Sequence, residues 1–468
     1  MTVPAAADAP DKADVLVVGA GFSGLSAALA LVDAGRSVTV VEAEPRVGGR
    51  TRSGMTADGQ WLELGGQWVG PEHLRLRALI ARFGLSTEPS GRTGAVVRVT
   101  NGIRTEIGEG EEALAVLSPA DAADVRQAAE RFAAIVDSVD MASPWSTPGA
   151  ESLDRGTFAD WIDRSLGSPA ARSYFSESCE AIFAPDPVDV SLLHAAYYFG
   201  SGGHIRSLLG VSREAQEERV TGGASAVCVA IGELLGERVV TGAAVRTIRV
   251  SDGVEAITRD GARFRARHVI VTLPPPLAGR LEYDPIMPSR RDQLTQRLHA
   301  ISVVKLYLVY ETPFWADAGL SGEGVLDAGP IRVVLDNTPV GYPRGVLVAF
   351  IEGADTIGPG PTDAESRRDA FLAAAVLLFG ARAADPLEYL EFDWMSEEFA
   401  RGCYSGHLAP GTWTRYGPAL TESVGPIHWA GTETAGEWTG YMEGAVRSGE
   451  RVAAEVLAAL AAEERGAL

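Results

Sequence analysis

The stretch at residues 13–43 constrains the fold of this chain more than any other. It predicts an apolar strand at 15–18, a helix rich in Ala and Leu that ends near Asp33, and a second strand at 37–41. The sequence Gly-Ala-Gly-Phe-Ser-Gly lies between the first strand and the helix and has the spacing G-x-G-x-x-G. Strand, glycine-rich turn, helix and strand in this order are typical of a unit that binds a dinucleotide.

Three glycines and one acid in this stretch are the expected cofactor contacts. Gly19 would allow a tight turn, Gly21 the approach of a pyrophosphate to bare backbone, and Gly24 the close packing of helix on strand. The N-terminus of the helix would offer unpaired N–H groups to the phosphates. Glu42 lies 18 residues after Gly24, where a carboxylate can accept hydrogen bonds from ribose hydroxyls.

Length and charge narrow the class of protein. The chain has 468 residues, which suits two or three structural units, and its 46% hydrophobic and 22% charged residues are typical of a globular protein. The formal net charge of −21 argues against nucleic acid or an anionic membrane surface as a partner. The same charge would favour a cationic small molecule, although it could equally serve solubility alone.

The cysteines and the N-terminus predict the compartment. Cys179, Cys228 and Cys403 form neither a complete disulfide set nor a metal-binding spacing, so we expect no metal and a reducing cytoplasm. Residues 1–12 have neither the basic start nor the apolar centre of a signal peptide. No run of about 18 apolar residues suggests a membrane span, so a soluble protein is expected.

Changes in sequence character predict two interleaved domains in an α/β (α+β) fold. A discontinuous Rossmann-type domain is expected from residues 1–88, 221–294 and 397–468. A substrate domain with a mixed sheet and helices is expected from 89–220, which is mostly helical, and 295–396. Since the nucleotide domain of nicotinamide dehydrogenases is usually contiguous, the interrupted one favours a flavoprotein with FAD.

Hydrophobic periodicity and turn signals predict the individual elements. Helices are expected at 120–137, 157–166, 170–182, 190–199, 224–235, 289–298, 364–379 and 443–460. Strands are expected at 238–240, 244–250, 254–259, 263–266, 268–272, 301–310, 331–335, 346–351 and 427–430. A glycine-rich loop is expected at 400–416.

Glycine doublets and a C-terminal strand–helix junction extend the expected cofactor site. Doublets of this kind could be surface loops, but beside a dinucleotide fold they indicate backbone that lies against the cofactor. The strand at 427–430, small residues and the last helix repeat an arrangement that binds phosphate or flavin. The expected contacts from these segments are Arg50, Gly65, Gly66, Gly431 and Thr432.

Lys305 is one of only two lysines in the chain and lies within the apolar sequence ISVVKLYLVY. Burial of an ammonium group is costly and lowers its pKa, so a lysine in such a strand indicates a function. The alternative is a lysine at a strand edge whose ammonium group reaches water.

Motifs along nearly the whole chain resemble those of the flavin-containing amine oxidase family, the monoamine oxidase group. They are GAGFSG, VEAEPRVGGRTRS, ELGGQWVGP, TGGASA, VVKLYLVYETPFW, GCYSGHLAPG and WAGTETAGEWTGYMEGAVRSGERVAAEVL. The resemblance implies FAD, oxidation of an amine to an imine, and reduction of O2 to hydrogen peroxide. Two departures are Ala226, where the family often has glutamine, and the lack of a C-terminal membrane anchor.

The resemblance also implies roles for individual residues. Lys305 would hold a water near flavin N5, and Tyr404 and Tyr441 would form an aromatic cage through which the amine reaches the flavin. Cys403 stands where some members link a sulfur to the flavin 8α-methyl, the alternative being a free thiol beside the ring. Val245 and Met442 complete the expected cofactor contacts.

The sequence thus predicts a flavin-dependent oxidase of a small apolar or aromatic amine. The expected partners are the amine, O2 and a second copy of the chain as a homodimer. Alternatives are an amino-acid, diamine or secondary-amine oxidase, a desaturase of the same fold, or a flavin-bound protein without turnover. The expected cavity walls are 174–183, 197–203 and 331–335. Arg206 and Arg332 lie close enough in sequence to leave open a contact with an α-carboxylate. The candidate anchors for a second ammonium group, Glu177, Glu180 and Asp336, are at best peripheral.

Overall fold

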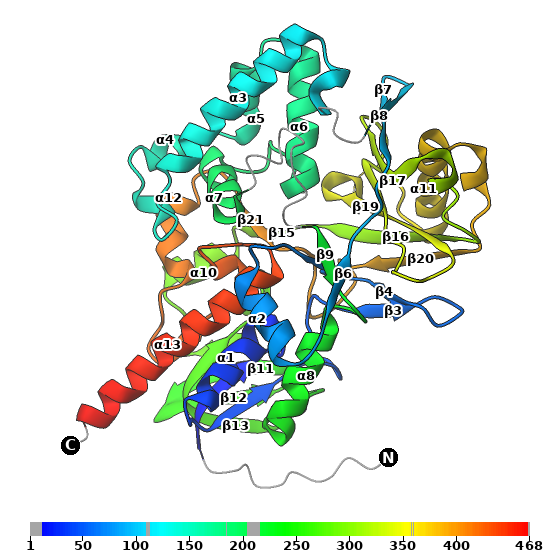
Figure 1. The fold of residues 1–468 in the computed structure, drawn as a ribbon. Coiled ribbons are helices and arrows are strands. Elements are labelled where there is room, and N and C mark those ends of the chain that lie inside the picture. Colours follow the sequence, from blue (N-terminus) through cyan, green and yellow to red (C-terminus); the bar gives the residue numbers. More distant parts are fainter. Residues whose placement is uncertain are drawn as a thin grey trace.

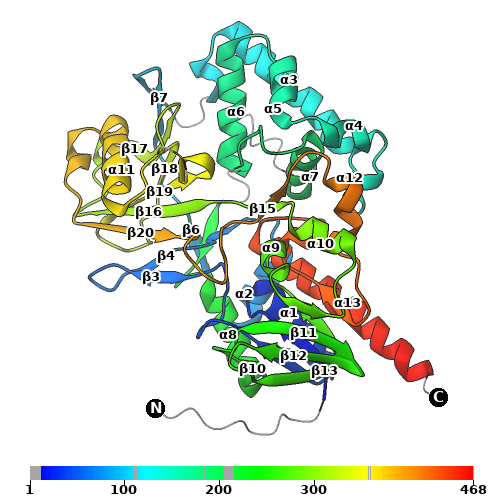
Figure 2. The same ribbon diagram turned by 180° about the vertical axis from the view of Figure 1, so that it is seen from behind.

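A computed structural model describes residues 12–108, 113–183, 185–203, 216–356, 358 and 360–466. Figures 1 and 2 show three groups of elements: a sheet with helices α1, α8 and α13 near the two termini, a group of helices α3 to α7, and a second sheet that carries helix α11. The mixed α/β architecture that the sequence predicts is confirmed.

An eight-stranded sheet draws its strands from three separated parts of the chain. Its order is β10-β2-β1-β13-β12-β11-β14, and β22 pairs with β13. Strands β1 and β2 are parallel and flank helix α1 in sequence, as the glycine motif predicts. The bounds are β1 Ala13–Val18, β2 Val38–Val41, β10 Val239–Val240, β11 Val245–Ser251, β12 Gly253–Thr258, β13 Arg263–Val271, β14 Glu282–Asp284 and β22 Ile427–Trp429.

Helix α1 (Phe22–Asp33) packs closely against the C-terminal helix α13 (Met442–Gly466). A Cβ on Gly449 of α13 would lie 2.3 Å from the backbone oxygen of Ser23, so glycine is required at this crossing. The hydroxyls of Ser23 and Ser448 are 2.9 Å apart and share a hydrogen bond. The last part of the chain is thereby held against the helix that follows the glycine-rich turn.

A seven-stranded sheet in the order β20-β16-β19-β18-β17-β7-β8 forms the second sheet group. All eight residues of β16 are buried, since it pairs with β19 and β20 on its two sides. The bounds are β7 Ala95–Thr100, β8 Ile103–Ile107, β16 Val303–Tyr310, β17 Leu320–Leu326, β18 Val333–Asp336, β19 Gly345–Glu352, β20 Glu388–Asp393 and α11 Ala364–Phe379.

The helical group has an aromatic core, in which the ring centroid of Phe132 lies 4.9 Å from that of Phe158 and 5.3 Å from that of Phe199. Aromatic pairs at such distances stabilise a core beyond the area they bury. The helices are α3 Pro119–Ser138, α4 Ala150–Arg155, α5 Phe158–Ser165, α6 Pro169–Phe183 and α7 Leu192–Gly202.

Smaller elements connect the three groups. The remaining helices are α2 Leu74–Arg82, α8 Ser225–Leu235, α9 Pro275–Ala278, α10 Ser289–Thr295 and α12 Trp413–Tyr416. The remaining strands are β3 Ser53–Met55, β4 Trp61–Glu63, β5 Trp68–Val69, β6 Thr87–Pro89, β9 Glu218–Val220, β15 Leu298–Ala300 and β21 Gly406–Leu408.

Three predicted elements differ in the structure because of strand pairing. The strands expected at 263–266 and 268–272 are one strand, β13, which pairs with β12 in its first half and with β1 in its second; Ala266 pairs with both. The helix expected at 289–298 ends at Thr295, because residues 298–300 pair with β21.

Two further segments contain structure that the sequence does not predict. The expected loop at 400–416 contains strand β21 and helix α12. The piece 89–220, expected to be mostly helical, begins with the hairpin β7–β8, which joins the second sheet through β17. The proposed domain limits themselves stay a prediction.

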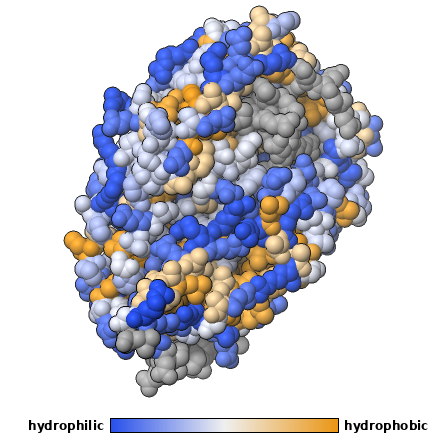
Figure 3. All heavy atoms as spheres, turned by 60° about the vertical axis from the view of Figure 1, so that its left-hand side comes forward, coloured by the Kyte–Doolittle hydropathy of each residue, from blue (hydrophilic) through white to orange (hydrophobic). Residues whose placement is uncertain are grey.

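The outer surface mixes hydrophilic and hydrophobic residues in small groups on the face shown in Figure 3. Among the helices that the structure describes, none combines the length and the apolar character needed to cross a membrane.

Candidate active site

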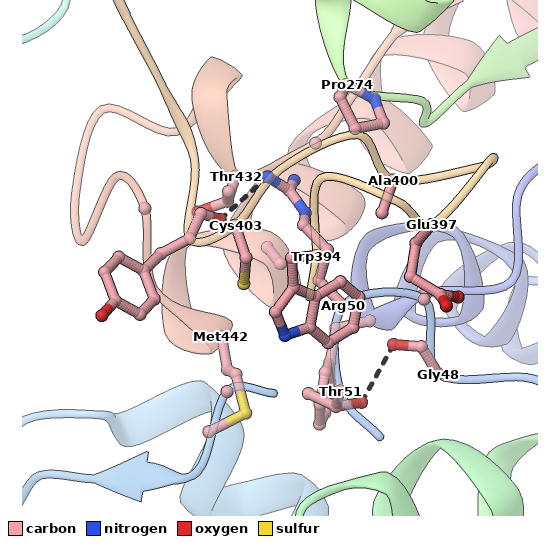
Figure 4. A pocket seen from close by; sticks show the side chains of 18 of the residues that line it. Gly48, Arg50, Thr51, Pro274, Trp394, Glu397, Ala400, Cys403, Thr432 and Met442 are labelled. Atoms are coloured by element: carbon pink, nitrogen blue, oxygen red, sulfur yellow. Dashed lines mark hydrogen bonds between the residues drawn. The ribbon is translucent and has the colours of Figure 1, made fainter. Parts of the chain in front are cut away.

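A cavity of about 920 Å³ lies where the sheet groups and the helical group meet. Its wall includes residues from β1, β11, β17, β18 and β19, the segment 394–404 and the start of α13. Figure 4 shows the side chains of Arg50, Trp394, Cys403 and Met442 around it. Segments hundreds of residues apart therefore share one site.

Gly19 and Gly24 are required by the fold itself. Gly19 has a φ of +106°, which disfavours any side chain, and a Cβ there would lie 2.5 Å from Oγ1 of Thr272. A Cβ on Gly24 would lie 2.0 Å from the backbone oxygen of Gly19. These contacts match the turn and packing tasks expected for the two glycines, of which only Gly19 lines the cavity.

Gly21 lines the cavity, and nothing in the protein requires glycine there. Its φ is −78°, which any residue adopts, and a Cβ would approach no atom closer than the Cα of Gly49, at 3.8 Å. Gly21 is the N-cap of helix α1, and neither its φ nor the packing around it requires glycine. A glycine at such a position fits a ligand that lies against the backbone.

Glu42 lies at the end of β2 on the cavity wall and is only 7% exposed. The N–H of Ala20 donates to its Oε2 at 2.6 Å, and that of Glu44 to its Oε1 at 2.8 Å. Burial raises the pKa of Glu42, and the two backbone N–H groups oppose this shift. The carboxylate is thus fixed at the position expected for a ribose contact, and Val245 lines the same cavity.

Arg50 lines the cavity and pairs with Glu433 of the chain's last segment. Its Nη1 donates to Oε1 of Glu433 at 2.7 Å and to the backbone oxygen of Tyr404 at 2.8 Å. Glu433 is not among the site residues that the sequence predicts. The arginine thus binds two other segments of the wall at once.

The two glycines of the second doublet, Gly65 and Gly66, have different roles. A Cβ on Gly65 would lie 2.2 Å from the backbone oxygen of Arg50, so this glycine serves packing and does not line the cavity. Gly66 lines the cavity with Met442 at 3.6 Å from where its Cβ would lie. Gly431, with a φ of +128°, and Thr432 also line it.

Lys305 lies on β16, in the interior of the second sheet, so the alternative of a lysine at a strand edge is wrong. It is 3% exposed, and its Nζ donates to the backbone oxygen of Gly65 at 3.0 Å and to Oε1 of Gln67 at 2.6 Å. Burial lowers the pKa of Lys305 to about 7, although Glu63 opposes the shift. Gly66 and Gln67 line the cavity, whereas Lys305 lies behind them.

Cys403 lines the cavity as a free thiol that is 3% exposed. Burial raises the pKa of this thiol to about 11, although the charges of Arg50 and Lys305 oppose the shift. The sulfur is therefore present as the neutral thiol near neutral pH.

The two tyrosines expected to form a cage both line the cavity. The ring of Tyr441 lies with its centroid 5.5 Å from that of Trp438 and 6.3 Å from that of Tyr198. The hydroxyl of Tyr404 donates to Oε1 of Glu352 at 2.5 Å. Rotation of both rings is thereby restricted by neighbours on other elements.

Two acids on the wall, Glu323 of β17 and Glu352 of β19, are not among the predicted site residues. Strand periodicity could have found Glu352, because it lies two residues after Phe350 and so shares its face.

The predicted charged anchors do not line the cavity where the structure describes them. Glu177 pairs with Arg98, and Asp336 pairs with Arg92 at 2.8 Å. Arg206 lies outside the described residues. The remaining two, Glu180 and Arg332, are not among the wall residues, although the charge of Glu180 acts on Glu352 of the wall.

Comparison with known proteins agrees with this geometry. The family model for flavin-containing amine oxidoreductases matches residues 22–457. The chain is 38% identical over 454 residues to a putative flavin-containing monoamine oxidase, AofH, of Mycobacterium tuberculosis, which covers 96% of this chain and 98% of that protein. It is 37% identical over 467 residues to putrescine oxidase of Kocuria rosea, which covers 95% of each.

Solved structures are similar over nearly the whole chain. A putrescine oxidase bound to putrescine superposes with a TM-score of 0.90 at 34% identity and covers 96% of this chain and 99% of that one. Cyclohexylamine oxidase from Brevibacterium oxydans IH-35A gives 0.89 at 32% identity with the same coverage. The chain therefore belongs to the flavin-containing amine oxidoreductase family and is an oxidoreductase that acts on amines.

Proposed function

We propose that the cavity binds FAD and that the protein oxidises a small apolar or aromatic amine to an imine, while O2 is reduced to hydrogen peroxide. The observation that carries the cofactor assignment is Gly21, whose bare backbone faces the cavity without any need within the protein. Glu42 supports it with a buried carboxylate on the same wall.

The residues of the wall divide into those for the nucleotide and those for the ring system. Gly19, Gly21 and the N-terminus of α1 would hold the pyrophosphate, and Glu42 the ribose. When bound, the flavin supplies the two-electron acceptor for the hydride of the amine Cα. The remaining wall residues assigned to the cofactor are Arg50, Gly66, Val245, Gly431, Thr432 and Met442, with Gly24 and Gly65 as packing support.

Lys305, Tyr404 and Tyr441 would act on the reaction. The buried ammonium of Lys305 would hold a water on the oxygen side of the site through its position behind Gly66 and Gln67. The tyrosine rings would stabilise the approaching nitrogen by about 0.5–2 kcal/mol each. Cys403 would bond to the flavin through its sulfur, and the neutral thiol is the alternative.

The wall away from the nucleotide residues favours an apolar substrate. Each buried methylene of such a substrate would gain about 0.8 kcal/mol. The apolar side chains on this part of the wall are Val96, Ile182, Val325, Val333, Leu335 and Phe350.

A diamine is the second candidate substrate. Glu323 and Glu352 line the cavity, and either carboxylate could pair with a second ammonium group. The similarity to putrescine oxidase agrees with this possibility. We also infer a cytoplasmic protein from its three free cysteines, and a homodimer stays a prediction.

Gly21→Val should abolish flavin binding while the protein stays folded, because the new methyl groups would occupy the pyrophosphate position. Wild-type protein should be yellow with one FAD per chain, and the variant colourless, as measured by absorbance after gel filtration. Gly156→Val is the matched control, since a Cβ there meets no atom within 4 Å and Gly156 does not line the cavity. A yellow Gly21→Val protein would overturn the assignment.

Lys305→Met should slow the return of oxidised flavin absorbance on mixing with O2 at least about tenfold, or about 1.4 kcal/mol of barrier. Anaerobic reduction by the amine should change much less, because the lysine lies behind Gly66 and Gln67 and not at the cage. Stopped-flow spectroscopy measures both half-reactions in the same protein, so any loss of stability affects both. Equal slowing of the two would make Lys305 a structural residue.

Acid precipitation should leave the flavin in the protein pellet, and Cys403→Ala should release it to the supernatant. The flavin is expected to stay with the protein because a thioether joins it to Cys403. Of the three free cysteines, only Cys403 lines the cavity and can form this bond. Cys179→Ala, a buried cysteine outside the cavity, should retain the flavin in the pellet. Free flavin from the wild type would refute the covalent bond.

An apolar monoamine should exceed putrescine and leucine in kcat/KM by at least about tenfold, or about 1.4 kcal/mol of transition-state binding. Peroxide assays on phenylethylamine, hexylamine, putrescine and leucine measure this. Putrescine as the best substrate would establish the diamine candidate, and Glu323→Gln should then raise its KM. Peroxide from none of these amines would contradict the proposed reaction.

A further inference from the structure

Glu352 is the last residue of β19 and lies on the cavity wall beside the proposed cage. The hydroxyl of Tyr404 donates to its Oε1 at 2.5 Å. Its other oxygen, Oε2, accepts no hydrogen bond from the residues that the structure describes. The carboxyl group is thus fixed at one oxygen and available at the other.

Among the residues that the structure describes, the groups around Glu352 provide no positive charge. Glu180 of α6 faces it, as do Tyr198 of α7 and the Cys403 thiol next to Tyr404. No described arginine or lysine forms an ion pair with it. Burial raises the pKa of Glu352 to about 7, and the charge of Glu180 adds to the shift. Above that pH the site holds a carboxylate without a positive partner among the described residues, so an ammonium group that enters the cavity could pair with it.

An amine substrate brings such a charge and has to lose it. A free alkyl ammonium has a pKa of about 10.4, so it arrives protonated. The nitrogen lone pair has to be available before a hydride can leave Cα, so one N–H proton has to be removed in the site. Burial in the same interior lowers the pKa of the Lys305 ammonium to about 7, which is also about that of Glu352.

On the basis of the proposed amine oxidation, we propose that Glu352 accepts the proton of the substrate ammonium at Oε2, while Tyr404 holds Oε1. One N–H bond breaks and one O–H bond forms, and no electrons are exchanged in this step. The neutral amine then loses its Cα hydride with the bonding pair, which leaves an iminium cation. Glu352 returns its proton to water after the product has left.

The pH dependence of Glu352→Gln tests this role. The amide oxygen can still accept from Tyr404, but the side chain cannot take a proton. Wild-type kcat/KM for hexylamine should rise with pH to about 7 and then stay level, following the pKa of Glu352. In the variant only the neutral amine reacts, so kcat/KM should rise about tenfold per pH unit up to about pH 10.4. At about pH 7.5 the variant should be slower by about a hundredfold or more, and near the amine pKa almost equal to wild type.

Two controls separate proton transfer from a structural effect. A β-fluorinated amine that is already neutral at the assay pH should react with Glu352→Gln almost as fast as with wild type. Glu180→Gln removes the carboxylate that faces Glu352, so it should keep the level region and move the acidic limb to lower pH. A pH-independent loss of activity in Glu352→Gln, present for both amines, would overturn the proposal. A loss confined to putrescine would make Glu352 a diamine anchor instead.

A measurement without turnover distinguishes a proton on Glu352 from an ion pair. A tertiary-carbon amine has no Cα hydrogen and cannot be oxidised. On its binding above pH 8, infrared difference spectra of the wild-type holoenzyme should gain a protonated carboxyl band that Glu352→Gln lacks. Binding without that band would refute the transfer, even if amines are oxidised. Absence of flavin reduction by every amine would refute the proposed function, while the infrared result would still decide the role of Glu352.

Discussion

The ion pair between Arg50 and Glu433 is the interaction on which the rest of the site depends. It joins a loop of the first sheet region to the segment before α13, and Arg50 also holds the backbone of Tyr404. Both side chains are largely buried, so loss of either partner would leave an unpaired buried charge at a cost of about 3–5 kcal/mol. The pair fixes the segments that carry Cys403, Tyr404 and Thr432 relative to the nucleotide-binding turn.

A second set of polar contacts joins the seven-stranded sheet to residues 63–67 behind the cavity. Lys305 of β16 donates to the backbone of Gly65 and to Gln67, while the hydroxyl of Tyr307, on the same strand, donates to the backbone oxygen of Glu63. Burial raises the pKa of the Glu63 carboxyl to about 7, and the Lys305 charge opposes the shift. The carboxyl accepts from the backbone N–H of Ala224 at Oε1, whereas Oε2 has no hydrogen-bond partner among the described residues, so this polar group inside the protein is only partly satisfied.

The nucleotide end of the site could be predicted because its signals are local. β1, α1 and β2 follow one another, and the glycines between them report backbone geometry directly, as Gly19 and Gly24 show. The amine end could not be predicted in the same way. Glu352 follows a run of mostly buried apolar residues. Its proposed role depends on its contact with Tyr404, 52 residues away in the sequence. The partner of Arg50, Glu433, is likewise set only by tertiary packing.

Burial shifts the pKa of both kinds of charged group, ammonium and carboxyl, in and around the cavity wall. Burial lowers the pKa of the Lys305 ammonium, behind the cavity wall, and raises that of the Glu352 carboxyl, on the wall, each to about 7. In water the difference between such groups is about six pKa units, or about 8 kcal/mol against proton transfer from ammonium to carboxylate. When the difference nearly disappears, neutral amine and neutral acid become accessible together. On the proposed reaction, a carboxyl group fixed at one oxygen in this cavity therefore prepares the amine for hydride loss without a strong base.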